Sequence, residues 1–183
     1  FCFCRDVTIE RTFEHQIWIS ANTDALTGLY NRRFFYEYMN ENRKENQLSL
    51  LYVDLDDFKK VNDAHGHHIG DGALELVARL MREAFPGDFI VRLGGDEFLI
   101  CLVGERSLAF LEEKANRLLQ SLLEAFQVSD YLRVMSASIG IASSADPGTK
   151  LDDLVRQSDI AMYAAKQSGK SRCCVYSSGL IKK

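Results

Sequence analysis

Two short apolar segments separated by a tight, glycine-containing turn constrain the fold of this 183-residue chain more than any other feature. The segments are Phe89–Leu93 and Glu97–Leu102, and Gly94-Gly95-Asp96 joins them. Glycine supplies the backbone conformations that short hairpin turns need, so the two segments are predicted to be adjacent antiparallel strands. The other elements of the chain are therefore expected to be arranged around an antiparallel sheet.

Helical and strand-like patterns alternate along the rest of the chain. Leu48–Leu55 is a nearly continuous apolar run, which is typical of a buried strand. Asn31 is a candidate N-cap of a helix that is expected to run to about Lys44. The other predicted elements are, in order, a polar glycine-bearing loop at 62–71, a helix ended by Pro86-Gly87, a helix over Leu108–Phe126, a strand over Tyr131–Ala142, a helix over 151–165 and a strand over Arg172–Tyr176.

The resulting order of elements predicts an α+β fold. Its inner part, βαββαβ, is the order of a ferredoxin-like antiparallel sheet flanked by helices. The strand that ends near Asp54 is expected to lie beside the hairpin, so that Asp54 and the hairpin turn face one pocket. We expect three segments: a linker or signalling helix over 1–22, one domain over 23–178 and a short tail over 179–183.

The first segment is predicted to contain a helix over Asp6–Ala21, with its apolar residues loosely on one face. That face could pair with an upstream element or a second copy of the chain, or it could fold back onto the domain. The chain begins with Phe1 instead of Met, so we expect it to be a fragment that a membrane or sensor region could precede.

The composition narrows the class of protein. Hydrophobic residues make up 46% and charged residues 26% of the chain, as in ordinary globular proteins, and no apolar stretch is long enough to span a membrane. The net charge of −4 argues against a surface for duplex DNA, so no nucleic acid partner is expected. Five cysteines without a CxxC pair favour reduced thiols and a cytoplasmic location.

Two groups of carboxylates are candidates for chemistry. Asp54, Asp56 and Asp57 end the buried strand, and Asp96 and Glu97 stand at the hairpin turn. Hard oxygen ligands select Mg²⁺ or Mn²⁺, and acids on two neighbouring strands suit two metal ions that promote phosphoryl transfer. The first group alone is equally compatible with a solvated acidic turn whose aspartates cap a helix.

Two further groups suit a nucleotide. Asn62 and Asp71 offer an amide and a carboxylate, and a carboxylate acceptor favours guanine because guanine presents adjacent ring N–H and amino donors. Lys166 and Lys170 lie one helical turn apart and could hold phosphates, or they could simply stabilise a helix C-terminus. Three nearby histidines raise the alternative of a zinc site, which the neighbouring carboxylates make less favourable.

Together these segments resemble the GGDEF domain, the diguanylate cyclase of bacterial signalling. The resemblance covers nearly the whole chain after Asn22. It rests on five motifs in the family's order, which are Asp24–Arg33, Asp54–Lys59 with the residues through Asp71, Arg92–Phe98, Ser138–Ala142, and Ala161–Lys166 with Gly169-Lys170.

The resemblance implies a palm-like fold and an enzyme that condenses two GTP into cyclic di-GMP and two pyrophosphates, with two Mg²⁺ or Mn²⁺ ions per active site. Asp54 and the backbone carbonyl of Leu55 would bind metal. Asp96 would be the acid associated with deprotonating the 3′-hydroxyl and with binding metal, and Glu97 would be a further ligand. Each domain would bind one GTP, so catalysis would need a homodimer.

The resemblance also implies the residues that bind substrate. Asn62 and Asp71 would read guanine, and His67 would lie near that pocket. The phosphates would be held by the following residues, the first three through their backbone amides: Asp57, Phe58, Lys59, Lys166 and Lys170.

Two positions depart from the family's pattern. Many members carry an inhibitory RxxD motif that binds the product, but here Phe85 replaces the arginine while Asp88 is retained, so weak or no feedback inhibition through that site is expected. Lys170 stands where arginine is common, which keeps the charge but not the planar guanidinium. The competing interpretations are a GTP-binding module without turnover and a nucleotide cyclase with a different base preference.

Overall fold

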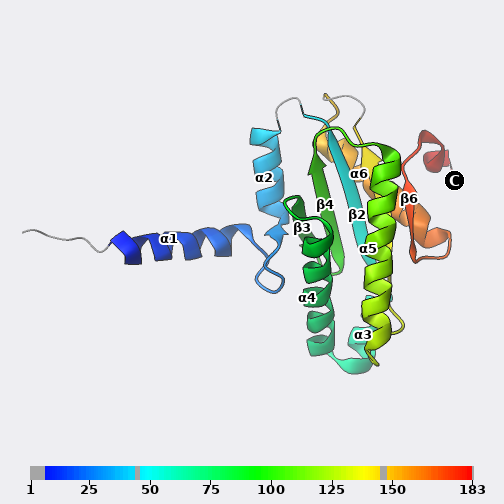
Figure 1. Ribbon diagram of the computed structural model, residues 1–183, viewed down its shortest axis with the longest axis horizontal. Helices are drawn as coiled ribbons and strands as arrows, with labels where there is room; N and C mark the ends of the chain where they lie inside the picture. Colours follow the sequence, from blue (N-terminus) through cyan, green and yellow to red (C-terminus); the bar gives the residue numbers. More distant parts are fainter. Residues whose placement is uncertain (1–6, 44–45, 145–147, 183) are drawn as a thin grey trace, which may run out of the picture.

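A six-stranded mixed sheet forms the centre of the protein in the computed structural model, which describes residues 7–43, 46–144 and 148–182 (Figure 1). The strand order is β1-β3-β4-β2-β5-β6. The inner four strands are antiparallel, whereas each edge strand pairs in parallel. The strands are β1 (Tyr30–Asn31), β2 (Leu48–Asp56), β3 (Phe89–Gly94), β4 (Glu97–Val103), β5 (Ser136–Ser143) and β6 (Arg172–Val175).

The predicted hairpin is confirmed. β3 and β4 are antiparallel neighbours, with Arg92 opposite Phe98 and Gly94 opposite Glu97. β2 lies directly beside β4, and Asp54 is opposite Glu97 in their register. The predicted order βαββαβ and the α+β class are therefore correct, and the end of β2 meets the hairpin turn at one edge of the sheet.

Helices cover both faces of this sheet (Figure 1). α4 and α5 pack on one face, and α2 and α6 pack on the other. Every residue of β2 is buried, which explains why its sequence is continuously apolar instead of alternating. The helices are α1 (Val7–Asn22), α2 (Arg32–Asn42), α3 (Phe58–His65), α4 (His67–Ala84), α5 (Leu108–Val128) and α6 (Leu151–Gln167), followed by the short 3₁₀ helix η1 (Ser178–Lys182).

α1 and α2 meet at the start of the domain. Asn31 caps α2 as predicted, since its side-chain oxygen accepts a hydrogen bond from the amide of Phe34 at 2.9 Å. α2 ends at Asn42, and Lys44, to which it was predicted to run, lies outside the described residues. α1 projects away from the sheet (Figure 1). The sequence analysis left open whether α1 pairs with another element or folds back onto the domain. Contact with the domain is seen at the C-terminal end of α1, where Trp18 contacts Phe34.

Two sequence predictions are wrong. Residues 62–71 do not form a loop, because α3 and α4 follow each other with only Gly66 between them. The strand predicted from Tyr131 begins only at Ser136. The preceding residues form turns, in which the amide of Met135 donates to the carbonyl of Leu132, and these two apolar side chains are buried in the core instead of in the sheet.

Candidate active site

The acidic residue at the end of β2 lies at the centre of the candidate site. Asp54 is only 7% exposed, and the Nζ atom of Lys166 in α6 lies 2.6 Å from its Oδ1 atom. Apart from this charged contact, Oδ1 is a buried acceptor without a hydrogen-bond partner. We regard the contact as an ion pair that leaves Asp54 able to accept a further ligand.

The environment of Asp54 disfavours its negative charge. Burial raises the pKa of this carboxyl, Lys166 lowers it, and the charges of Asp96 and Glu97 add to the increase, so that the net pKa is about 6. Carboxylates on adjacent strands thus repel one another, and one lysine does not fully compensate them. A divalent cation is the species that would relieve this repulsion.

The hairpin turn brings two more acids to Asp54. The amide of Leu55 donates to the carbonyl of Asp96 at 3.2 Å, which closes the turn against the end of β2. Glu97 accepts a hydrogen bond from the hydroxyl of Tyr52 at 3.1 Å. Burial and the neighbouring Glu97 raise the pKa of Tyr52, so its hydroxyl stays protonated and remains a donor to Glu97. The sequence analysis did not identify Tyr52, because one tyrosine in an apolar run resembles an ordinary core residue.

Asp56 is a neighbour of Asp54 with a different environment. Its carboxylate accepts hydrogen bonds from the hydroxyls of Ser136 at 2.7 Å and Ser138 at 2.9 Å, and from the amide of Ser171 at 3.2 Å. Ser171 belongs to the turn after α6. Asp56 therefore connects β2, β5 and this turn, and its oxygens are already engaged. Alternation along the strand placed Asp56 beside Asp54 but could not reveal these partners.

The N-terminus of α3 lies next to these acids. Asp57, in the left-handed conformation at φ 61°, makes no capping hydrogen bond, so the first amides of α3 stay available to a ligand. Its carboxylate instead pairs with Lys60 at 2.8 Å and with Lys170 at 3.0 Å. These two lysines hold the pKa of Asp57 below its usual range. Of the two other candidates here, Phe58 is buried and Lys59 is exposed.

The candidate guanine-binding residues lie on two successive helices. Asn62 belongs to α3, while His67 and Asp71 are exposed in the first two turns of α4. The Oδ1 atom of Asn62 is buried and has no hydrogen-bond partner. Its amide lies against Gly70, the residue directly before Asp71.

An arginine next to the hairpin connects the site to the start of the domain. Arg92 donates to the carbonyl of Gly95 from Nε at 3.1 Å and from Nη2 at 2.8 Å. Its Nη1 atom donates to Asp24 at 3.0 Å, and Asp24 also accepts from the amide and hydroxyl of Thr27. Asp24 comes two residues after the end of α1. Arg92 thus fixes the turn that carries Asp96 to the segment that follows α1, a role that sequence alone did not reveal.

The position expected to be a degenerate inhibitory site is built into the core. Phe85 is fully buried, and the ammonium group of Lys114 lies 5.0 Å from its ring centroid. Asp88 is half-buried, and burial raises its pKa. An apolar side chain that points into the core cannot grip a nucleotide at the surface.

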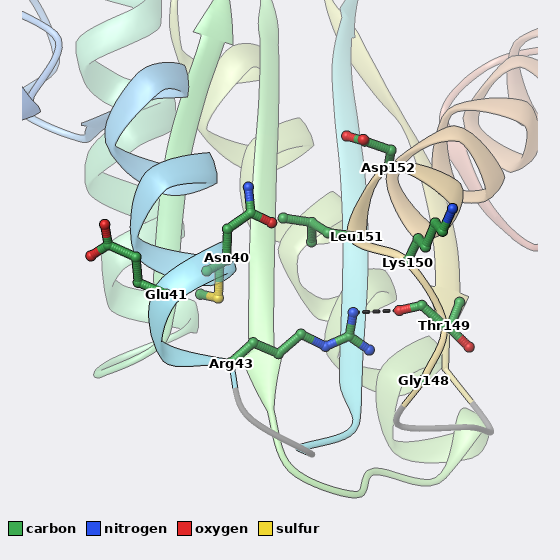
Figure 2. A pocket seen from close by; sticks show the side chains of 9 residues that line it. Asn40, Glu41, Arg43, Gly148, Thr149, Lys150, Leu151 and Asp152 are labelled. Atoms are coloured by element: carbon green, nitrogen blue, oxygen red, sulfur yellow. Dashed lines mark hydrogen bonds between the residues drawn. The ribbon is translucent and has the colours of Figure 1, made fainter.

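A separate pocket of about 460 Å³ lies at the other end of the sheet (Figure 2). It opens between the end of α2 and the start of α6, where Arg43 donates to the carbonyl of Thr149. Its lining contains the basic residues Arg43 and Lys150 and the acidic residues Glu41 and Asp152, so neither sign of charge predominates. None of the lining residues belongs to the acidic cluster of Asp54, Asp96 and Glu97.

Among the residues that the structure describes, no group of three or more His, Cys, Asp or Glu side chains is arranged to hold a metal ion. In the same part of the chain, no helix is both long enough and apolar enough to cross a membrane.

Comparison with known proteins identifies the family. A sequence model described as diguanylate cyclase, GGDEF domain, matches residues 21–172. The chain therefore belongs to the GGDEF diguanylate cyclase family, as its motifs indicated.

The similar proteins include one named as a cyclic di-GMP phosphodiesterase and one named as a diguanylate cyclase. The chain is 37% identical over 179 residues to the cyclic di-GMP phosphodiesterase PdeR of Escherichia coli (strain K12), covering 96% of this chain and 27% of PdeR. It is 32% identical over 180 residues to a diguanylate cyclase of Vibrio cholerae serotype O1, covering 93% of this chain and 54% of that protein. The chain thus spans about a quarter to a half of these relatives.

A solved structure supports the fold. The coiled coil and GGDEF domain of DgcB from Caulobacter crescentus, in complex with c-di-GMP, has a TM-score of 0.81 at 28% identity and covers 92% of this chain and 94% of that one. The active GGEEF domain of a diguanylate cyclase from Vibrio cholerae has a TM-score of 0.66 at 29% identity, covering 78% and 89% of the two chains. The predicted palm-like α+β fold is therefore confirmed.

Proposed function

We propose that this domain condenses two GTP molecules into cyclic di-GMP. In each of two equivalent steps the 3′-oxygen of one GTP attacks the α-phosphorus of the other, and the bond to pyrophosphate breaks. The observation that carries the proposal is the position of Asp54 directly opposite Glu97, next to the turn that holds Asp96. Three carboxylates at one sheet edge are the groups that phosphoryl transfer with divalent metal requires.

The donor set fits Mg²⁺ or Mn²⁺. Asp54 offers a buried oxygen without a hydrogen-bond partner, and the proposed ligands are Asp54, the carbonyl of Leu55, Asp96 and Glu97. Bound there, two such cations would acidify the 3′-hydroxyl and stabilise the leaving pyrophosphate. Asp96 accepts the proton of that hydroxyl in our proposal, and Tyr52 holds Glu97 in place by its hydrogen bond.

The substrate is held by the residues around this edge. The free amides at the start of α3, over Asp57, Phe58 and Lys59, bind the phosphates, because a helix N-terminus attracts anions. Lys166 and Lys170 exchange their carboxylate partners, Asp54 and Asp57, for phosphate oxygens. The guanine base is read by three residues of α3 and α4, which are Asn62, His67 and Asp71.

The reaction needs two copies of the domain, since each binds one GTP and the product joins two. We therefore propose a catalytic homodimer, with residues 1–22 as a connecting helix, 23–178 as the catalytic domain and 179–183 as a tail. The exposed Phe13 and Ile17 on α1 are available to pair with a second copy. We also propose a cytoplasmic location and a sensor domain upstream in the full-length protein.

The test is product formation. The purified chain is incubated with GTP and Mg²⁺, and cyclic di-GMP is quantified by chromatography and mass spectrometry at several protein concentrations. Asp96→Ala should abolish synthesis, whereas Asp130→Ala, which removes an exposed carboxylate paired with Arg133, should not. A dimeric preparation that binds GTP but forms no cyclic di-GMP would refute the proposed reaction.

A second candidate is a regulatory GTP-binding module without turnover. Its support is the similarity to PdeR, which is named as a cyclic di-GMP phosphodiesterase and not as a cyclase. The presence of all three carboxylates favours synthesis, because binding alone does not need an acid to accept a proton. The two candidates differ in one result: the module binds GTP but leaves it unchanged.

A further inference from the structure

The side chain of Asn62 lies against Gly70 of α4, in the space that a Cβ atom at position 70 would occupy. A Cβ atom added at Gly70 would lie 2.0 Å from Oδ1 of Asn62, 2.9 Å from its Cγ and 3.2 Å from its Nδ2. Carbon and oxygen atoms that are not bonded to each other do not approach to 2.0 Å. The amide of Asn62 therefore occupies the volume that the side chain of any other residue at position 70 would fill.

Protein stability does not explain this arrangement. Glycine within a helix is less stable than alanine, and Gly70 lies inside α4 without an unusual backbone conformation. The arrangement also leaves Oδ1 of Asn62 buried and without a hydrogen-bond partner, which is a second cost to the folded state. Alanine at position 70 would remove the first cost and displace the unpaired atom. Two unfavourable features at one contact indicate a role other than folding.

Close packing of α3 on α4 does not explain the glycine either. At Gly72, two residues further along the same helix, an added Cβ would meet nothing within 4 Å. At Gly140, by contrast, an added Cβ would lie 1.9 Å from the backbone oxygen of Ser158. A glycine that close backbone packing requires therefore has backbone atoms as its nearest neighbours. At Gly70 the three atoms nearest to an added Cβ all belong to the end of the Asn62 side chain.

We infer that Gly70 is a positioning residue that determines base specificity, because its missing side chain lets the Asn62 amide lie at the position just before Asp71. This inference rests on the proposed function, in which these two residues read one purine edge. Asn62 is on α3 and Asp71 is on α4, so the contact at Gly70 is what sets the amide relative to the carboxylate. Gly70 itself has no atom that would bind the base.

The pair Gly70→Ala and Gly72→Ala provides a matched test. Both variants exchange glycine for alanine in α4, and both should raise or maintain the melting temperature. Only Gly70→Ala should weaken GTP binding, by about tenfold or more, the effect of losing one hydrogen bond to the base. Its KM for GTP should rise with kcat at saturation nearly unchanged, and its preference for GTP over ATP should fall. Gly72→Ala should keep the wild-type KM.

Asn62→Ala completes a double-mutant cycle with Gly70→Ala. If Gly70 acts through Asn62, the double variant should bind GTP no more weakly than Asn62→Ala alone. Wild-type affinity in Gly70→Ala, a lower melting temperature in that variant, or additive losses in the double variant would each overturn the inference.

Binding is measured by calorimetry with GTP in EDTA, where no turnover occurs. This separates the inference from the proposed function. A wild-type protein that binds GTP and is weakened by Gly70→Ala supports the inference even if it makes no cyclic di-GMP. A wild-type protein that makes product while Gly70→Ala binds GTP normally refutes only the inference. A wild-type protein that neither binds GTP in EDTA nor makes product with Mg²⁺ refutes both.

Discussion

Replacing Asp54 by asparagine should make the metal-free protein more stable while abolishing synthesis. The pKa of Asp54 is raised from 3.8 to about 6, so the folded protein binds the proton more tightly than the unfolded chain does. Stability therefore falls as the pH rises between these two values, because the folded state must then hold an unfavourable charge. At 1.36 kcal/mol for each pKa unit, the charge costs about 3 kcal/mol at pH 8 and about half of that at pH 5.

Asparagine imitates the protonated carboxyl and avoids this cost. Asp54→Asn should raise the free energy of unfolding by about 3 kcal/mol at pH 8 and by about half of that at pH 5. Urea denaturation in EDTA at the two pH values measures both numbers. Asp130→Asn, at an exposed ion pair with Arg133, is the matched control and should change stability by less than about 0.5 kcal/mol.

Metal provides the second half of the test. Mn²⁺ should stabilise the wild-type protein by mass action and should have a much smaller effect on Asp54→Asn, which has lost a charged ligand. A variant that is less stable than wild type at pH 8, or equally stabilised at both pH values, would show that Lys166 outweighs burial and that our account of the site is wrong.

Three other predictions follow from the neighbouring contacts. Tyr52→Phe removes only the hydroxyl that orients Glu97, so the affinity for Mn²⁺ should fall by about tenfold. Electron paramagnetic resonance measures this affinity, and an unchanged value would contradict the role of Tyr52. Asp56→Asn should lower the free energy of unfolding by about 2–3 kcal/mol in urea and raise the KM for GTP, because it loosens the turn at Ser171; a stable variant with normal KM would contradict it. Added cyclic di-GMP should not inhibit in the low micromolar range, and inhibition that disappears in Asp88→Ala would refute the expected loss of that site.

The sequence predicts the sheet better than it predicts the turns around it. The hairpin and the strand beside it follow from local signals, since the Gly94-Gly95 turn and the apolar run before Asp54 each admit few structures. The segment at 131–135 has the same apolar content as a strand, but Leu132 and Met135 fill the core from a turn. Composition does not distinguish these two ways of burying a side chain.

Residues 62–71 show the opposite error. Their polar and glycine content is typical of a loop, yet they form the end of α3 and the start of α4, which meet at Gly66. Gly70 is one of the residues that suggested a loop, and it lies within α4, where it accommodates Asn62. A glycine that serves a contact is indistinguishable in sequence from one that serves a turn.

The candidate site illustrates how far a motif can be interpreted. Asp54 and Asp56 are equivalent in sequence pattern, since both are aspartates on one face of β2. They differ in their partners: the serine hydroxyls and the Ser171 amide satisfy Asp56, whereas Asp54 keeps an acceptor without a hydrogen bond. These partners come from β5 and the turn after α6, about 80 and 115 residues away in the chain. No local pattern contains that information.

The same contacts explain how a chain of net charge −4 could bind a triphosphate. Both cations proposed to hold the phosphates are paired with aspartates: Lys166 with Asp54 and Lys170 with Asp57. Each lysine is partly exposed, so a phosphate can replace the carboxylate without entering a dry interior. The aspartate released from Lys166 is the proposed metal ligand. Binding of the anion and of the metal should therefore be mutually favourable, which is why the affinity for GTP is expected to be higher with Mg²⁺ than in EDTA.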